Sequence, residues 1–71
     1  MTVEVRAPLA GKIWKVLVEV GANVDEDDEL LVIEALKMEN TVYSPAKGTV
    51  KEILVKKDDS VEDDQLIMVI E

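Results

Sequence analysis

The hydrophobic residues of this chain fall into short runs separated by polar turns. The runs KIWKVLVEV and TVKEILVKK are rich in β-branched and aliphatic residues, and neither keeps a 3.6-residue period long enough for a helix. We therefore predict strands with one buried face. Because amphipathic helical segments and their caps are absent from the pattern, the sequence predicts an all-β fold.

The same pattern occurs twice. Residues 8–34 align with residues 45–71 at a shift of 37 positions without a gap, and nine of the 27 pairs are identical. Average amino-acid usage would give about one or two identities. Two copies of one unit are too few for a solenoid. We expect a single domain over residues 1–71, a flattened barrel or sandwich in which the two halves cover each other's apolar faces.

Each half has the same parts in the same order. A proline and then a glycine open it, a strand follows, and a polar turn leads to the closing strand. The turns hold a lone valine between polar residues, Val24 in the first half and Val61 in the second. We expect each valine to fill part of the core from a very short strand.

The segment ALKMENTVYS joins the two halves. We expect strands over residues 31–35 and 39–43, with Leu36, Lys37 and Met38 in a tight turn between them. The turn has no glycine, Asn-Gly or Asp-Gly, so turn propensity did not select these residues. The position equivalent to Lys37 in the second half falls just beyond the chain ends. The hairpin tip and the termini should therefore lie on opposite sides of the molecule.

Lys37 differs in context from an ordinary surface lysine, which is simply a solvated charge. Its neighbours Leu36 and Met38 are apolar at a position expected to be exposed, and Glu34 and Glu39 lie close by in the sequence. This combination indicates a segment that another protein recognises.

Composition narrows the classes of function. The chain has 71 residues, no cysteine and no histidine, and a formal net charge of −8. It lacks the commonest general base and the commonest metal ligand, so we expect neither a catalytic nor a metal site. The negative charge disfavours nucleic acid and anionic membranes as partners. With neither a spanning run nor a signal-peptide block, we expect a cytoplasmic protein.

The residues around Lys37 match a known family. The motif EALKMEN resembles the biotin-attachment motif of biotin carboxyl carrier domains, in which a modified lysine lies between two methionines. The segments RAPLAGKIWKVLVEVGANV and SPAKGTVKEILVKKDDSVEDDQLIMVIE are similar to the two halves of that family, so the resemblance covers nearly the whole chain. It implies two four-stranded antiparallel sheets with the carrier lysine on an exposed hairpin.

The resemblance also implies a function. Lys37 would be biotinylated by a biotin–protein ligase, with Leu36 and Met38 as flanking recognition residues and Glu34, Ala35 and Glu39 completing the motif. The biotin would carry carboxylate from a biotin carboxylase to a carboxyltransferase that acts on an acyl-CoA or a 2-oxo acid. The domain itself would be a non-catalytic carrier.

The chain departs from the family pattern at several positions. Leu36 replaces the usual first methionine, a substitution of similar volume that the ligase is expected to tolerate. Asp27 and Asp64 stand at turn positions where carriers usually have glycine, and Asp58 stands at the equivalent of Gly21. Aspartate tolerates left-handed backbone angles better than most residues. The extra "thumb" segment of some carriers and the usual Ala/Pro-rich linker are absent. The sequence is compatible with either a stand-alone carrier or an excised domain.

Three alternatives stay open. A lipoyl carrier shares the fold and the hairpin lysine, but lipoyl domains usually have Asp-Lys-Ala at this place; a small carrier that accepts both biotin and lipoate is also possible. An adaptor barrel with an unmodified Lys37 usually has a long helical insertion at the hairpin. A Schiff-base enzyme would need a desolvated lysine, which a hairpin tip does not offer.

Two aromatic residues and the acidic turns have simpler interpretations. Trp14 is expected to be partly exposed and to pack or to dock a partner, and Tyr43 to pack beside the hairpin strand. The acidic runs at residues 25–29 and 62–64 are expected to be solvated turns that could steer the protein toward basic surfaces.

Overall fold

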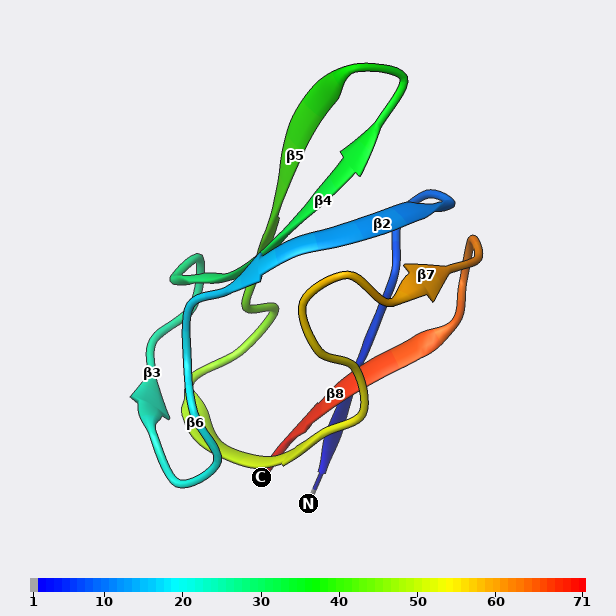
Figure 1. Ribbon diagram of the computed structural model, residues 1–71. Coiled ribbons are helices and arrows are strands. Elements are labelled where there is room, and N and C mark those ends of the chain that lie inside the picture. Colours follow the sequence, from blue (N-terminus) through cyan, green and yellow to red (C-terminus); the bar gives the residue numbers. More distant parts are fainter. Residues whose placement is uncertain (1) are drawn as a thin grey trace.

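The computed structural model describes residues 2–71, so residue 1 of the predicted domain lies outside the described residues. The described residues form eight β-strands in two four-stranded antiparallel sheets, and the all-β prediction is confirmed (Figure 1). The first sheet has the strand order β1-β8-β6-β3 and the second has the order β5-β4-β2-β7. The strands are β1 (Val3–Arg6), β2 (Gly11–Val16), β3 (Asn23–Val24), β4 (Glu29–Ala35), β5 (Met38–Tyr43), β6 (Gly48–Ile53), β7 (Ser60–Val61) and β8 (Leu66–Ile70).

The strand register reproduces the sequence repeat. Ile13 pairs with Ile33 between β2 and β4, and the equivalent residues Val50 and Ile70 pair between β6 and β8. The same shift of 37 relates the pairing of β5 with β4 to that of β1 with β8. The structural repeat is therefore longer than predicted, because it includes β1 and β5. The sequence does not show this extension of the repeat, because Val5 is the one residue of β1 that is identical to its equivalent in β5.

One apolar core lies between the two sheets. Its largest fully buried side chains come from both halves in equivalent pairs, such as Ile33 with Ile70 and Leu31 with Met68. Val24 and Val61 are 4% and 3% exposed and belong to this core. The two-residue strands β3 and β7 carry them, so the prediction that these valines fill the core is confirmed.

The acidic turns have left-handed backbone conformations where they were expected. Asp27, Asp58 and Asp64 have φ angles of 72°, 76° and 69°, and Gly21, equivalent to Asp58, has a φ of 94°. Side chains brace these turns, since Asp28 accepts a hydrogen bond from the N–H of Asp25 at 2.8 Å. Aspartate therefore replaces glycine without changing the turn.

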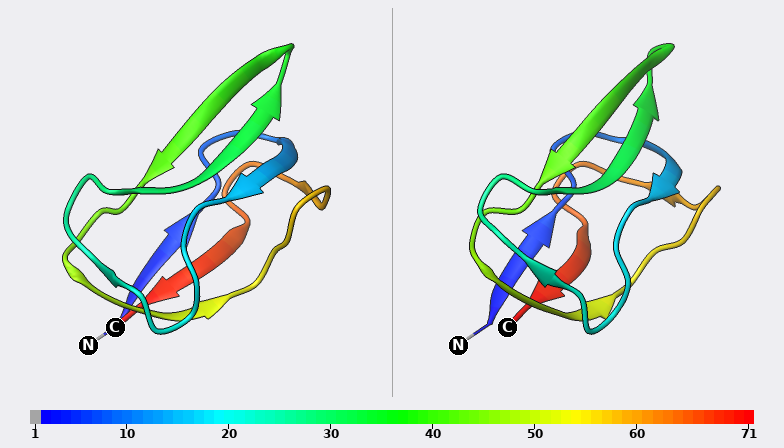
Figure 2. Two further views of the ribbon diagram at one scale, coloured as in Figure 1. Left: turned by 60° about the vertical axis from the view of Figure 1, so that its left-hand side comes forward. Right: turned by 90° about the vertical axis from the view of Figure 1, so that its left-hand side faces the viewer.

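The molecule is elongated, and the β4–β5 hairpin projects from one end. Its principal extents are 33 × 17 × 17 Å. Both ends of the described chain lie at the opposite end from the hairpin tip in every view (Figures 1 and 2). The predicted opposition of tip and termini is confirmed. Within residues 2–71, the structure has no helix with the length and apolarity needed to cross a membrane.

Candidate functional site

The candidate site is the tip of the β4–β5 hairpin. The ladder between these strands runs without interruption from Leu31 and Val42 to Ala35 and Met38. Only Leu36 and Lys37 remain for the turn, with φ angles of 53° and 64°. Positive φ at both central residues defines a type I′ turn, whose twist matches that of the flanking strands. The turn therefore has two residues, and the prediction that Met38 belongs to it is wrong, because Met38 already pairs within β5.

The backbone of this turn is unfavourable for its residues. Type I′ turns favour Asn-Gly because a side chain in the left-handed region costs about 1–2 kcal/mol per residue. Leu36 and Lys37 both have such side chains, and neither is of the types that tolerate this region best. The continuous backbone ladder between β4 and β5 holds the conformation. Leu36 and Lys37 therefore make the backbone of this turn less favourable than Asn-Gly would.

The side chains of the tip are exposed to solvent. Leu36 is 94% exposed and Met38 is 65% exposed, and every other large apolar side chain among residues 2–71 is less exposed than these two. Lys37 lies between them and is also exposed. Neither of the two ion pairs within residues 2–71 includes Lys37, since they join Arg6 to Glu4 and Lys12 to Asp58. The amine of Lys37 is therefore accessible to a macromolecular partner.

The remaining predicted site residues occupy two rungs of the hairpin ladder. Glu34 lies directly opposite Glu39, and Ala35 lies directly opposite Met38. Residues opposite each other in a ladder share a face of the sheet. The structure thus brings the other five predicted residues together around Lys37, with the two carboxylates on one face of the hairpin and the methionine on the other.

Two residues that support the tip were not predicted. The side-chain amide of Asn40 donates hydrogen bonds to the carbonyl oxygens of Ile33 and Met38, at 3.4 and 3.3 Å. Gly11 lies against the base of the hairpin, where a Cβ atom would come within 2.5 Å of the carbonyl oxygen of Glu34. The only sequence signal was an asparagine within a strand and a glycine at a strand start.

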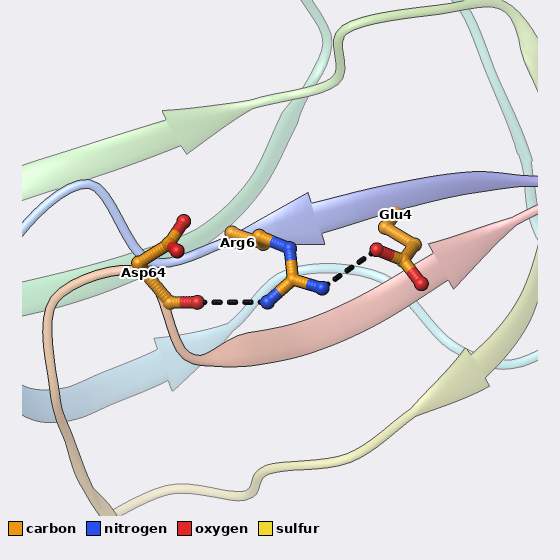
Figure 3. Close-up of polar contacts among 3 residues, drawn as sticks. All are labelled: Glu4, Arg6 and Asp64. Atoms are coloured by element: carbon orange, nitrogen blue, oxygen red, sulfur yellow. Dashed lines mark hydrogen bonds and ion pairs between the residues drawn. The ribbon is translucent and has the colours of Figure 1, made fainter.

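A shallow groove of about 390 Å³ lies away from the tip, between β1 and β5, and no residue of the turn lines it. Arg6 on one bank forms an ion pair with Glu4 at 2.7 Å and donates a hydrogen bond to the carbonyl oxygen of Asp64 (Figure 3). The hydrogen bond to Glu4 and its charge raise the pKa of the Arg6 guanidinium. These groups are exposed to solvent and are not arranged as a catalytic site. Within residues 2–71, no group of three or more potential ligand side chains could hold a metal ion.

The geometry of the tip is that of an attachment point. A primary amine lies at the end of a projecting two-stranded arm, with no general base or buried pocket among the described residues around it. Such an amine can form an amide bond when another enzyme activates the acyl group. The side chain of Lys37 is exposed and does not lie in a desolvated pocket of the kind that activates a catalytic lysine.

The known proteins that are similar in sequence to this chain agree with one another. The family model described as "Biotin-requiring enzyme" matches residues 3–70. Mitochondrial pyruvate carboxylase of Homo sapiens is 43% identical over 68 residues, which is 96% of this chain and 6% of that protein. The biotin carboxyl carrier protein of Streptococcus mutans is 44% identical over 64 residues, or 89% of this chain and 49% of that protein.

Solved structures agree with the sequence relatives. The urea carboxylase of Kluyveromyces lactis contains a region with a TM-score of 0.95 and 34% identity, which covers 100% of this chain and 6% of that one. The present chain therefore spans a small part of the carboxylases that it matches and about half of the carrier protein.

Proposed function

The chain belongs to the family of biotin-requiring enzyme domains, and on that premise we propose that Lys37 is its site of biotin attachment. A biotin–protein ligase would join the carboxyl group of biotin to Nζ of Lys37 through an amide bond. The observation that carries this proposal is the position of Lys37 in an exposed two-residue turn at the tip of a projecting hairpin. The domain is a carrier and supplies no catalytic group.

The residues around Lys37 suit attachment of this group. The amine has no ion-pair partner among residues 2–71, so a ligase meets it without breaking a contact. Leu36 and Met38 offer apolar surface on either side. Glu34 and Glu39 add two carboxylates on one face of the arm. We assign recognition by the ligase to these flanking side chains and to Ala35.

Biotin held on Lys37 would supply a ureido ring able to carry a carboxyl group between a biotin carboxylase and a carboxyltransferase. The contribution of this chain is positional. The ladder of β4 and β5 holds Lys37 in the turn at the hairpin tip. Figure 2 shows this tip at the end of the molecule opposite the ends of the described chain. Anything joined to the termini is therefore kept away from the arm, which can enter two active sites in turn.

The experiment that tests attachment is the intact mass of the protein after co-expression with a biotin–protein ligase. We expect one biotin adduct on the wild-type protein and none on a Lys37→Arg variant with the same thermal unfolding midpoint. Lys51→Arg, a change of another exposed lysine, is the matched control and should be modified fully. A parallel reaction with a lipoyl ligase identifies the alternative cofactor: an adduct from that ligase alone would replace biotin by lipoate. No adduct from either would overturn the carrier function.

A further inference from the structure

The outer face of the β5-β4-β2-β7 sheet holds an apolar residue that does not belong to the core. Val32 pairs with Lys15 on one side and with Thr41 on the other, in the rung between the core residues Leu31 and Ile33. Alternation along a strand directs it away from the core, and it is absent from the core cluster. Val32 is nevertheless only 4% exposed. Neighbouring side chains on the outer face must cover it.

A β-bulge brings a tryptophan to this place. Ile13 pairs with Ile33, and the next pair joins Lys15 to Val32. Trp14 is therefore an extra residue in β2, which lies beside Lys15 opposite Val32. Nζ of Lys15 lies 4.8 Å from the centroid of the Trp14 ring, which places both side chains on the same side of the sheet. Trp14 stays 39% exposed.

The apolar surface continues onto β5. Tyr43 lies two residues after Thr41 on the same face of the strand and is 53% exposed. Thr41 and Tyr43 also form one bank of the groove between β1 and β5. Trp14, Val32, Thr41 and Tyr43 together make a surface that we name the Trp14–Tyr43 face.

The internal repeat provides a built-in comparison. The residues equivalent to Trp14, Thr41 and Tyr43 on the other sheet are Lys51, Glu4 and Arg6. They surround Val69, the equivalent of Val32, in the same register and with the same bulge. The fold is therefore satisfied by charged residues at these positions. Trp14 and Tyr43 lie on the sheet that carries the Lys37 hairpin, and their equivalents on the other sheet are charged. The barrel therefore does not require aromatic side chains at these positions.

Carboxylates border the Trp14–Tyr43 face at both ends. Glu34 and Glu39 form the next rung toward the tip on the same face, and Glu29 is paired with Tyr43 at the other end. The acidic run at residues 25–29 joins this end, because the N–H of Ser44 donates to the carbonyl oxygen of Asp28. A second copy with a net charge of −8 would bring like charges together. Lys12 lies opposite Glu34 and Lys15 lies opposite Val32, so β2 adds two positive charges to this face and the acidic border follows β4 and β5. A partner surface with an apolar centre and basic groups facing these carboxylates is complementary.

We infer that the Trp14–Tyr43 face docks the carrier onto a biotin carboxylase whose surface around the active-site entrance is apolar at its centre and basic at its rim. The identity of this partner rests on the proposed function. The face lies on the hairpin sheet, so docking there directs β4 and β5 toward the partner together with Lys37. The aromatic side chains become buried in the complex and supply the affinity, and the carboxylates guide the approach.

The test replaces the apolar residues by those that the fold already accepts at the equivalent positions. The variant Trp14→Lys/Tyr43→Arg, and the two single variants, are biotinylated and compared with wild type as substrates of the biotin carboxylase of the source organism. We expect the KM for the carrier to rise at least tenfold in the double variant, with kcat within twofold of wild type. The KM of the wild-type protein should also rise with ionic strength.

The matched control is Val20→Lys, which removes an apolar side chain that is 63% exposed in the loop after β2 and introduces the residue found at its equivalent, Lys57. Its KM should stay within twofold of wild type. An unchanged KM in the double variant, or an equal rise in the control, would overturn the docking face while biotinylation stands. A wild-type dimer in sedimentation that the double variant loses would assign the face to self-association instead. Failure of biotinylation itself would remove both proposals.

Discussion

At the scale of single residues, the turn at Leu36 and Lys37 combines an unfavourable backbone with almost complete exposure of the side chains. Neither the core nor the ladder needs a leucine at a site that is 94% exposed. Exposed apolar residues in a strained turn therefore indicate that recognition, and not stability, determines their identity. The sequence revealed this conflict because turn residues were missing where a turn was required. It did not reveal that the turn has only two residues.

We predict that Leu36→Asn stabilises the protein by about 0.5–1 kcal/mol, because asparagine tolerates positive φ better than leucine. The free energy of unfolding in urea measures this change. The rate of biotinylation by the ligase should fall several-fold at the same time, since the apolar flank of Lys37 is lost.

Leu36→Ala serves as the control for this prediction. It removes the same apolar surface but does not improve the turn, so its biotinylation should slow without a gain in stability. If Leu36→Asn were less stable than Leu36→Ala, the backbone of the turn would not be the source of strain.

At the scale of elements, the start of β2 packs closely against the base of the β4–β5 hairpin and so fixes the direction in which the hairpin projects. A Cβ atom on Gly11 would lie 2.5 Å from the carbonyl oxygen of Glu34 and 2.7 Å from Cγ2 of Ile33. Both contacts are too short for any real side chain, and the first is with backbone that cannot rotate away. The equivalent Gly48 has the same relation to Glu71 and Ile70. Close packing of two strands therefore accounts for both glycines.

Gly11→Ala should lower the free energy of unfolding by about 1–3 kcal/mol, the usual cost of forcing an added group into a packed site. Equilibrium denaturation measures this loss. Amide hydrogen exchange of Ala35 and Met38 should also become faster, because β4 must shift at the base of the hairpin.

The matched control is Gly21→Asp. Gly21 has a φ of 94° but no atom within 4 Å of the position of a Cβ, and its equivalent is already an aspartate, Asp58. This change should cost less than about 1 kcal/mol, because aspartate tolerates left-handed angles. Equal losses in the two variants would mean that the close approach of Glu34 and Ile33 adds no cost at Gly11.

At the scale of the whole molecule, charge and shape act together. Sixteen acidic and eight basic residues are spread over a barrel 33 Å long. The raised pKa of Arg6 gives no pH dependence of stability near neutral pH, because its stabilisation is fully present below the ordinary pKa of arginine and is lost only in strong alkali. With a formal net charge of −8, repulsion between carboxylates opposes folding at neutral pH.

We predict that stability rises with ionic strength, by on the order of 1 kcal/mol between about 20 and 300 mM sodium chloride, because salt screens this repulsion. The midpoint of urea unfolding at the two salt concentrations measures the effect.

The double variant Glu26→Lys/Asp63→Lys is its control. These exposed residues occupy equivalent positions in the acidic turns, and each substitution changes the charge by two, so the formal net charge moves from −8 to −4. The salt dependence should shrink by about half. A variant as sensitive to salt as wild type would show that another effect of salt dominates.

The amino-acid sequence by itself determined the all-β class, the two-fold repeat and the place of Lys37 between the halves. Alternation, turn residues and repetition are local properties, so they can be read along the chain. The core valines Val24 and Val61 were also readable, because a lone apolar residue that recurs in two equivalent polar turns gains stability only by burial. The left-handed conformation of Asp58 followed from its equivalence to Gly21, and that of Asp27 and Asp64 followed from the resemblance to carriers that usually have glycine there.

Only the tertiary structure decided which residues meet across strands. Pairing of β1 with β8, the close approach at Gly11 and the bracing of the tip by Asn40 depend on register and on distances between segments far apart in the chain. The Trp14–Tyr43 face likewise joins residues of β2, β4 and β5, and a bulge sets the side on which Trp14 lies. Each sheet face is assembled from several strands, so its chemistry exists only after the strands have paired.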